Sequence, residues 1–486
     1  MPAEAVADLL SDPVTCYRVV SSRDARWDGR LYLGVATTGV YCRPSCPART
    51  PRPENCRYYS SAAAAVAAGY RACRRCRPDA LPGTRDDDHR ADLAARALRL
   101  IRDGSADGHG VAGVAARLHV SERHLHRVLV SEVGVGPLRL ASSRRAQVAR
   151  ILVEQSDLSM AEVAFAAGYA SVRQFNDVMR AEFGCPPSAL RTRVPASDRR
   201  PVPQGPGLTL RLRYREPYAV TPVWAYLGAR LVPGVESLEQ SGGIVRSVPA
   251  RSGTSRVCVE PPTGSLVLLR LELTELSDLG PVVGSVRRWL DLDADPAAVD
   301  DTLSNDPPMA ELVHRVPGMR VPGAADGFEL AVRAVVGQQV SVAGARTMLG
   351  RLAGTVGQPG SFPLPDEVAA AGESGLARLG LTGSRVRAIV ALAEQIVAGT
   401  LVLDPGADRA GTRAQLRAIP GIGAWTAEYV ALRALADPDA WPSTDLVLRR
   451  RVLSGGLQPD RWRPWRGYAA MHLWTDQATT TTEERR

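Results

Sequence analysis

Apolar and polar residues alternate with different periods in successive parts of the chain. Near the start, LYLGVATTGVYC predicts a strand that enters a turn, and SSAAAAVAAGY predicts a short helix capped by Ser60 or Ser61 and closed by Gly69. Over residues 91–190 apolar residues recur at spacings of three and four, which predicts helices throughout. Two alternating strands, LTLRLRY and GSLVLLRLEL, come next, and the pattern is again helical after about residue 291.

Two stretches without apolar periodicity divide these parts. They are RPDALPGTRDDDHRAD and RTRVPASDRRPVPQGPG, at residues 77–92 and 191–207, and both are rich in turn-forming or charged residues. We therefore expect a multidomain α+β protein. Its predicted parts are a small α/β module at 1–80, an all-α domain at 90–193, a small antiparallel β domain at 207–290 and an all-α domain at 291–480.

The composition indicates a polyanionic binding partner and excludes one class of catalytic mechanism. The 486 residues carry a formal charge of +9, which favours binding to nucleic acid. The chain contains no lysine, so a mechanism that needs a lysine Schiff base is excluded. It has no apolar run of the roughly 18 residues that span a bilayer, and MPAEAVADLLSDPV does not resemble a leader, so we expect a cytoplasmic protein without a membrane partner.

Four of the eight cysteines form two closely spaced pairs, Cys42-x3-Cys46 and Cys73-x2-Cys76. Two such pairs can place four thiolates around one Zn2+, which would also stabilise a small domain. The spacing alone is also compatible with an inert structural site, in which the four cysteines only hold the metal. Arginines around both pairs favour a role on phosphates instead, and they are Arg43, Arg71, Arg74, Arg75 and Arg77. The other cysteines (Cys16, Cys56, Cys185 and Cys258) are expected to be ordinary buried residues.

The surrounding motifs, TGVYCRPSC and AGYRACRRCRPD, closely resemble the N-terminal domain of the Ada family. The resemblance implies that Cys42 accepts a methyl group from a methylphosphotriester in damaged DNA, irreversibly for each protein molecule. A zinc-bound thiolate is a suitable nucleophile for that reaction. Methylation of one ligand changes the formal charge of the Zn2+ and four thiolates from −2 to −1, which would strengthen DNA binding.

Two segments of the middle domain fit helix-turn-helix patterns. In SMAEVAFAAGYASVRQFNDVMRAEFG, Gly168 supplies the turn and Ser171 caps the second helix. VAGVAARLHVSERHLHRVLVSEVG is a weaker copy because His119 replaces the turn glycine. The residues expected to face DNA are Arg123, His124 and Arg127 in this copy, and Arg173, Gln174, Asn176 and Arg180 in the clearer one.

The alternative for these segments is a plain helical bundle. Two copies joined by a helix resemble the AraC-type DNA-binding domain, which implies that the protein binds promoter DNA and activates transcription. RNA polymerase is then an expected partner.

The segment LRAIPGIGAWTAEYVALRAL contains two helical stretches joined by Pro420-Gly-Ile-Gly423. Gly421 and Gly423 let the backbone N–H groups at the second helix approach a DNA phosphate. The hairpin and the following WPSTDLVL resemble the helix-hairpin-helix glycosylase superfamily, which implies that Asp445 is the catalytic carboxylate. The resemblance also implies that carbonyls around Arg417, Ile419 and Ile422 could hold a monovalent cation against the phosphate. The alternative role of Asp445 is to cap the next helix.

Five ordered segments, from PYAVTPVWAYLGAR to RPWRGYAAMHLW, resemble the AlkA family of DNA-3-methyladenine glycosylases. The resemblance implies that a flipped base enters a pocket with four aromatic walls, namely Tyr226, Trp425, Tyr429 and Trp474. Trp462 and Trp465 are expected in the core. In the AlkA family a leucine fills the gap left by the flipped base, and the aligned residue here is Gln339. The family also has an aromatic residue beside the catalytic aspartate, where this chain has Leu446.

These features together predict a monofunctional alkylbase DNA glycosylase (type II) joined to a methyl-accepting transcriptional activator. We expect a monomer that binds alkylated and promoter double-stranded DNA and needs no organic cofactor. The alternative is a damage-sensing transcription factor whose glycosylase-like half is inactive and only binds DNA.

Overall fold

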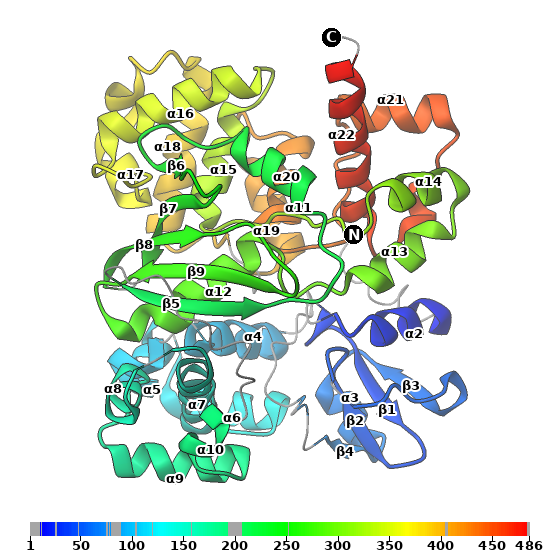
Figure 1. Cartoon of the computed structure of the whole chain (residues 1–486), viewed down its shortest axis with the longest axis vertical. Coiled ribbons are helices and arrows are strands. Elements are labelled where there is room, and N and C mark those ends of the chain that lie inside the picture. Colours follow the sequence, from blue (N-terminus) through cyan, green and yellow to red (C-terminus); the bar gives the residue numbers. More distant parts are fainter. Residues whose placement is uncertain are drawn as a thin grey trace.

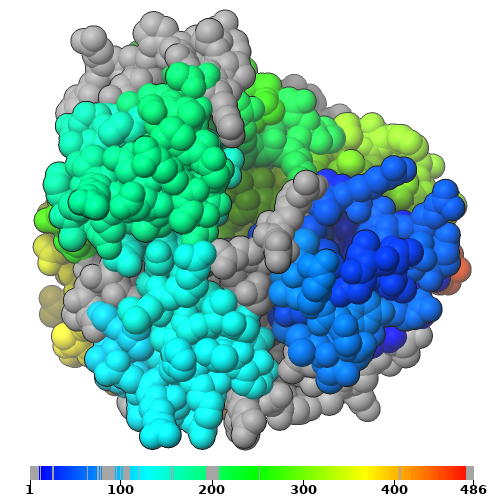
Figure 2. All heavy atoms as spheres, turned by 90° about the horizontal axis from the view of Figure 1, so that it is seen from below, coloured from blue at the N-terminus to red at the C-terminus, as the bar shows by residue number. Residues whose placement is uncertain are grey.

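The computed structural model describes residues 10, 12–24, 27–46, 48–73, 76, 78, 89–102, 105–118, 120–156, 158–192, 207–250, 252–403 and 407–483. The C-terminal half lies above the N-terminal module and the middle domain, which sit side by side beneath it (Figure 1, Figure 2). Most of both predicted linkers lies outside the described residues. So do His119 and three of the arginines expected near the cysteines, Arg74, Arg75 and Arg77.

The N-terminal module is built on a four-stranded sheet with the order β3-β1-β2-β4. Its elements are α2 (Pro13–Ser22), β1 (Tyr32–Val35), β2 (Val40–Cys42), η2 (Pro53–Asn55), β3 (Cys56–Tyr59), α3 (Ala62–Ala67) and β4 (Arg71–Ala72). The predicted strand and turn form the antiparallel pair β1–β2, in which Leu33 lies opposite Cys42. Ser61 caps α3, because its hydroxyl accepts a hydrogen bond of 3.1 Å from the N–H of Ala64. The predicted mixed module is confirmed.

The described part of the middle domain is helical, as predicted. Its helices are α4 (His89–Arg102), α5 (Ser105–Arg117), α6 (Glu122–Val133), α7 (Pro137–Gln155), α8 (Met160–Ala166), α9 (Val172–Phe183) and α10 (Pro187–Thr192). Between α8 and α9, Gly168 has a φ of +80° and Ser171 caps α9 by accepting from the N–H of Gln174 at 3.2 Å. Leu125 of the first copy belongs to a separate core, whereas Phe175 of the second joins the main core. Helices of both helix-turn-helix units, α5 and α6 in the first and α8 and α9 in the second, contact the long helix α7.

The third part contains a five-stranded antiparallel sheet with the order β5-β9-β8-β7-β6. Its elements are β5 (Leu208–Arg213), α11 (Val220–Gly228), β6 (Glu236–Leu238), β7 (Ile244–Ala250), β8 (Gly253–Val259), β9 (Leu266–Glu272), η5 (Leu276–Asp278) and α12 (Leu279–Trp289). The two strands predicted from alternation are neighbours, with Leu210 opposite Leu269 and Leu212 opposite Val267. All four side chains are buried, so one face of this pair lies in the core.

The rest of the chain is an all-α domain. Its elements are α13 (Pro296–Ser304), α14 (Pro307–Arg315), α15 (Gly327–Val336), α16 (Val342–Val356), α17 (Pro365–Leu376), α18 (Gly383–Val397), α19 (Arg409–Ala418), α20 (Ala424–Arg433), α21 (Leu446–Gly455), η6 (Pro459–Trp462) and α22 (Arg466–Glu483). Helix α15 is buried on most of its surface and contacts α16, α18 and α20. Trp462 and Trp465 are fully buried, as predicted. The predicted fold class is confirmed.

Among the described residues, no helix combines the length and the apolar character that crossing a bilayer requires.

Candidate active site and metal centre

Asp445 lies where α20, α21 and α22 meet, and N–H donors from all three hold its carboxylate. Oδ1 accepts from the backbone N–H of Val447 at 3.0 Å and of Leu448 at 3.1 Å, so Asp445 is the N-cap of α21. Oδ1 also accepts from the indole N–H of Trp474 on α22 at 3.1 Å, and Oδ2 accepts from that of Trp425 on α20 at 2.9 Å. The donors fix both oxygens, so the carboxylate is held in one orientation.

The Asp445 carboxylate faces a cavity of about 870 Å³. All four aromatic residues expected as pocket walls line it, namely Tyr226, Trp425, Tyr429 and Trp474. Trp425 stacks on Tyr429 with ring centroids 5.0 Å apart and planes 14° apart, and Trp474 is tilted by 58° against Tyr429. The structure thus brings the expected walls and Asp445 to one cavity large enough for a purine base.

Arg433, which sequence reasoning did not identify, lies at the base of this cavity. Its Nη1 donates to the hydroxyls of Tyr226 at 2.8 Å and Tyr429 at 2.6 Å, and its Nε donates to the carbonyl of Pro322 at 2.6 Å. The Arg230 guanidinium covers one face of Tyr226, 3.7 Å from the ring centroid. Burial acts to raise the pKa of Tyr226, but the charges of Arg433 and Arg230 outweigh it and lower that pKa. A sequence signal existed, since Arg433 follows Tyr429 by one helical turn.

The predicted hairpin connects α19 and α20, and a second glutamine ties it to the loop before α16. Gly421 has a φ of +94°, the left-handed conformation that glycine favours. Gln338 Nε2 donates to the carbonyl of Gly421 at 3.1 Å and to the hydroxyl of Thr426 at 2.8 Å. The neighbouring Gln339 is exposed and has a φ of +54°. Gln338 therefore fixes the position of Gln339 relative to the hairpin, a link that the motif GQQVS did not reveal.

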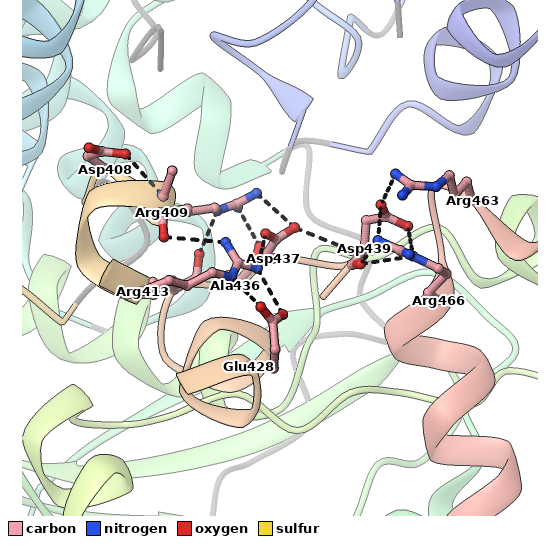
Figure 3. Close-up of polar contacts among 11 residues, drawn as sticks. Asp408, Arg409, Arg413, Glu428, Ala436, Asp437, Asp439, Arg463 and Arg466 are labelled. Atoms are coloured by element: carbon pink, nitrogen blue, oxygen red, sulfur yellow. Dashed lines mark hydrogen bonds and ion pairs between the residues drawn. The ribbon is translucent and has the colours of Figure 1, made fainter. Parts of the chain in front are cut away.

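Buried ion pairs hold the loop between α20 and α21 (Figure 3). The carboxylate of Asp437 pairs with Arg409 at 3.2 Å and with Arg413 at 2.7 Å, both on α19. Asp439 pairs with Arg466 at the start of α22 at 2.9 Å. Burial acts to raise the pKa of Asp437, but the two guanidiniums outweigh it and hold that pKa well below its usual range. The loop is therefore fixed at two points before it reaches the carboxylate at the N-cap of α21.

The four cysteines predicted to bind metal come together in the N-terminal module. They are Cys42, Cys46, Cys73 and Cys76, and their sulfur atoms lie within 4.8 Å of one another. Four thiolates bound to one Zn2+ at about 2.3 Å lie roughly 3.8 Å apart, so this arrangement suits Zn2+ after a small closure. None of the eight cysteines forms a disulfide, and Cys16, Cys56 and Cys258 are buried as expected, whereas Cys185 is partly exposed.

A buried aspartate supports the loop between the first two of these cysteines. Asp28 accepts from the backbone N–H of Ser45 at 2.9 Å and from its hydroxyl at 2.5 Å. Its carboxylate also lies 3.6 Å from the guanidinium of Arg43, whose side chain is 27% exposed. Arg43, expected to contact DNA, is thus turned partly toward its own module.

The residues expected to face DNA on the two helix-turn-helix units differ in exposure. Arg123 and Arg127 on α6 and Arg173 on α9 are exposed, and Arg127 lies 3.0 Å from a ring nitrogen of His124. Gln174 is exposed, but its side chain accepts from the N–H of Ala170 at 3.1 Å. Asn176 is half-buried and donates to the carbonyl of Val172 at 3.0 Å, so it lies further from the surface than the helical pattern suggested.

Four family models match successive parts of the chain. They are "Metal binding domain of Ada" at residues 15–79, "Helix-turn-helix domain" at 114–193, "AlkA N-terminal domain" at 209–326 and "HhH-GPD superfamily base excision DNA repair protein" at 332–457.

Curated relatives match the same parts, one of them along nearly the whole chain. The "Probable bifunctional transcriptional activator/DNA repair enzyme AlkA" of Mycobacterium tuberculosis is 43% identical over 478 residues, which are 95% of each chain. The "DNA-3-methyladenine glycosylase 2" of Escherichia coli is 32% identical over 54% of this chain and 95% of its own. Among solved structures, the 3-methyladenine DNA-glycosylase from Archaeoglobus fulgidus superposes with a TM-score of 0.48 and 21% identity, covering 54% of this chain and 96% of its own.

The first prediction concerns the backbone of the hairpin. Gly421→Ala should lower the free energy of unfolding by on the order of 1 kcal/mol, because alanine disfavours a positive φ. Its Cβ would also lie 3.2 Å from the carbonyl of Ser384. Gly423→Ser is the matched control, since a Cβ there meets nothing within 4 Å and serine is a good N-cap for α20. Urea unfolding checks both variants, and an equal loss in the two would contradict the account.

The second prediction concerns the buried charge of Asp437. Asp437→Asn should lower the free energy of unfolding by about 3 kcal/mol at pH 7, because buried Arg409 loses its ion pair with Asp437 and Arg413 keeps only the one with Glu428. The folded pKa lies below the unfolded value, so this stabilisation is complete above the unfolded pKa of about 3.9 and is lost as the pH falls through the folded pKa.

The difference between wild type and Asp437→Asn should therefore shrink on acidification below about pH 4. Urea unfolding between about pH 7 and pH 3 measures it, with exposed Asp460→Asn as the control that changes little. A difference that grows as the pH falls would rule out this role for Asp437.

Proposed function

Because the chain belongs to the family of bifunctional transcriptional activator and DNA repair proteins, we propose that its C-terminal half removes alkylated bases from DNA and that its N-terminal half senses alkylation and activates transcription. The Ada-type and AlkA-type resemblances drawn from the motifs are confirmed by the family models and the relatives. The expectation of DNA repair joined to transcriptional activation is confirmed with them. The roles of individual residues are our proposals.

The observation that carries the repair function is the fixed carboxylate of Asp445 at the edge of an aromatic cavity. An N-alkylated purine such as 3-methyladenine is cationic and leaves as a neutral base, so it needs little help from a general acid. The sugar left behind resembles an oxocarbenium ion, which the Asp445 carboxylate stabilises while water adds to the anomeric carbon. Two indole N–H groups and two backbone N–H groups keep the carboxylate in place throughout.

The aromatic walls supply the binding of the flipped base. Trp474 donates its indole N–H to Asp445, so its ring lies against the reaction centre and can stack on an electron-poor base. Trp425 and Tyr429 already stack on each other and form one rigid wall. The chain has no lysine to form a Schiff base, so the product is an intact abasic site.

The hairpin supplies an anchor on the DNA backbone. The N–H groups at the start of α20, after Gly421 and Gly423, bind a phosphate, and the carbonyls around Arg417, Ile419 and Ile422 would hold a monovalent cation that adds positive charge at this anchor. Gln339 fills the gap in the duplex after base flipping. Its exposed side chain and fixed backbone support that role.

Cys42 is the proposed methyl acceptor. Bound Zn2+ keeps the four cysteines as thiolates at neutral pH. The Cys42 sulfur forms a bond to the methyl carbon of a methylphosphotriester while the carbon–oxygen bond breaks, and the electron pair stays on the resulting phosphodiester. The site then loses one negative charge, which favours DNA binding through Arg43 and the exposed arginines of α6 and α9.

Activation of transcription further implies promoter DNA and RNA polymerase as partners. We expect a cytoplasmic monomer. The competing function is a damage sensor whose glycosylase-like half binds DNA but releases no base.

Asp445→Asn separates these two functions. Asparagine also caps helices, so the fold and DNA binding should persist, while release of 3-methyladenine from methylated DNA falls by at least about 100-fold. Asp408→Asn, at the N-cap of α19 and away from the cavity, is the matched control and should keep full activity. Wild-type protein that releases no base would favour the competing function, and a fully active Asp445→Asn would exclude Asp445 as the catalytic group.

Cys42→Ala tests methyl acceptance. The variant should take up no label from DNA that carries radioactive methylphosphotriesters, because the nucleophilic sulfur is missing. Cys185→Ala, which changes a cysteine outside the four-cysteine cluster, should be labelled like wild type. Labelling of Cys42→Ala to the same extent would overturn the assignment.

A further inference from the structure

A tryptophan of the N-terminal module packs against the core of the glycosylase domain. Trp27 and Trp465 meet edge to face, with ring centroids 6.3 Å apart and planes 83° apart. Trp465 is fully buried and Trp27 is 7% exposed. Such a buried aromatic pair stabilises the contact beyond the effect of the apolar area that it removes from water. The two tryptophans thus form a docking contact between parts of the chain that are far apart in the sequence.

Other contacts extend this interface on both sides of Trp27. Helix α2 of the module packs against α13 of the glycosylase domain, and the two lie next to each other in Figure 1. Arg215 of the β domain donates to the carbonyl of Arg23 at 3.4 Å. The charge of Arg30 helps to keep the pKa of Asp437 low, after the larger effects of the arginines on α19. The interface therefore includes apolar, polar and charged contacts.

On the side of the module, Trp27 is joined to the cysteine loop. The next residue, Asp28, accepts both the backbone N–H and the hydroxyl of Ser45, which precedes the zinc ligand Cys46. Loss of order in the Cys42–Cys46 loop would therefore break these hydrogen bonds and loosen the segment that carries Trp27.

On the glycosylase side, Trp465 is joined to the loop of the catalytic carboxylate. Its backbone N–H donates to the carbonyl of Trp462 at 2.7 Å, and Trp462 packs edge to face on Trp441 with ring centroids 5.6 Å apart. Trp441 begins the short WPSTD segment that ends at Asp445. Trp465 also packs edge to face on Tyr468 of α22, the helix that carries Trp474.

We propose that the Trp27–Trp465 contact docks the N-terminal module on the glycosylase domain, so that the order of the Cys42–Cys46 loop stabilises residues 459–468 next to the catalytic loop. The partner of this surface is therefore the chain's own repair domain. The coupling rests on packing and holds whether or not the glycosylase is active.

Hydrogen exchange of the full-length protein tests the coupling directly. Peptides across residues 459–468 are followed by mass spectrometry with zinc bound and after removal of zinc by a chelator. In wild type, removal of zinc should speed exchange in this segment by at least about fivefold, the lower end of typical coupling between two sites. In Trp27→Leu, exchange there should already be fast with zinc bound and should not increase further.

Tyr59→Ala is the matched control, because it removes an aromatic ring that packs in a separate small cluster of the same module. It should respond to the chelator as wild type does. Zinc content near one per chain shows that the module of Trp27→Leu still forms, and Trp27→Phe replaces it in the same measurement if zinc is lost. A wild-type segment whose exchange is the same with and without zinc would overturn the proposal, as would a Trp27 variant that responds like wild type.

Discussion

The fixed position of the Asp445 carboxylate is the constraint around which the repair site is arranged. Its donors come from the first turn of α21 and from indoles on α20 and α22, so one side chain joins three helices. The indoles that orient the carboxylate also line the aromatic cavity. In the proposed mechanism, stacking of the base and stabilisation of the sugar cation therefore depend on the same two side chains, and a shift of either helix would disturb both.

The absence of lysine affects the architecture as well as the chemistry. Three buried arginines, Arg320, Arg409 and Arg433, each donate to two or more backbone carbonyls, which suits the planar guanidinium better than an ammonium group. Arg320 is fully buried and donates to the carbonyls of Asp291, Ala294 and Pro217 at 3.1–3.2 Å. Arg433 likewise joins two tyrosine hydroxyls to the backbone at the base of the pocket. A chain whose basic residues are arginines and not lysines thus has cations suited to buried structural roles. It lacks the amine nucleophile that strand cleavage through a Schiff base needs.

Local patterns predicted much of the fold and the centre of the site, because both depend on short stretches of sequence. The four cysteines lie within residues 42–76, and the hairpin glycines and the aspartate after them lie within residues 421–445, so each motif is contained in one short stretch. Sequence patterns did not identify Arg433, Gln338 or Trp27, because the roles of these residues depend on contacts that no local motif displays. A buried arginine contradicts the usual preference of charged residues for the surface, and the contact of Trp27 with Trp465 has no periodicity that a sequence could display. Strands β6 to β8 were also not identified, since their pairing is decided by neighbours along the sheet.

In the proposed mechanism, hydrogen bonds to the carboxylate, and not the aspartate alone, make the site catalytic. The rate of 3-methyladenine release by Trp425→Phe under single-turnover conditions tests it most directly, because phenylalanine keeps an aromatic ring beside Tyr429 and removes the indole donor to Asp445. A lost hydrogen bond to a charged group costs about 1.5–3 kcal/mol, so the rate constant should fall tenfold or more while the affinity for DNA stays unchanged. An unchanged rate constant would contradict the account.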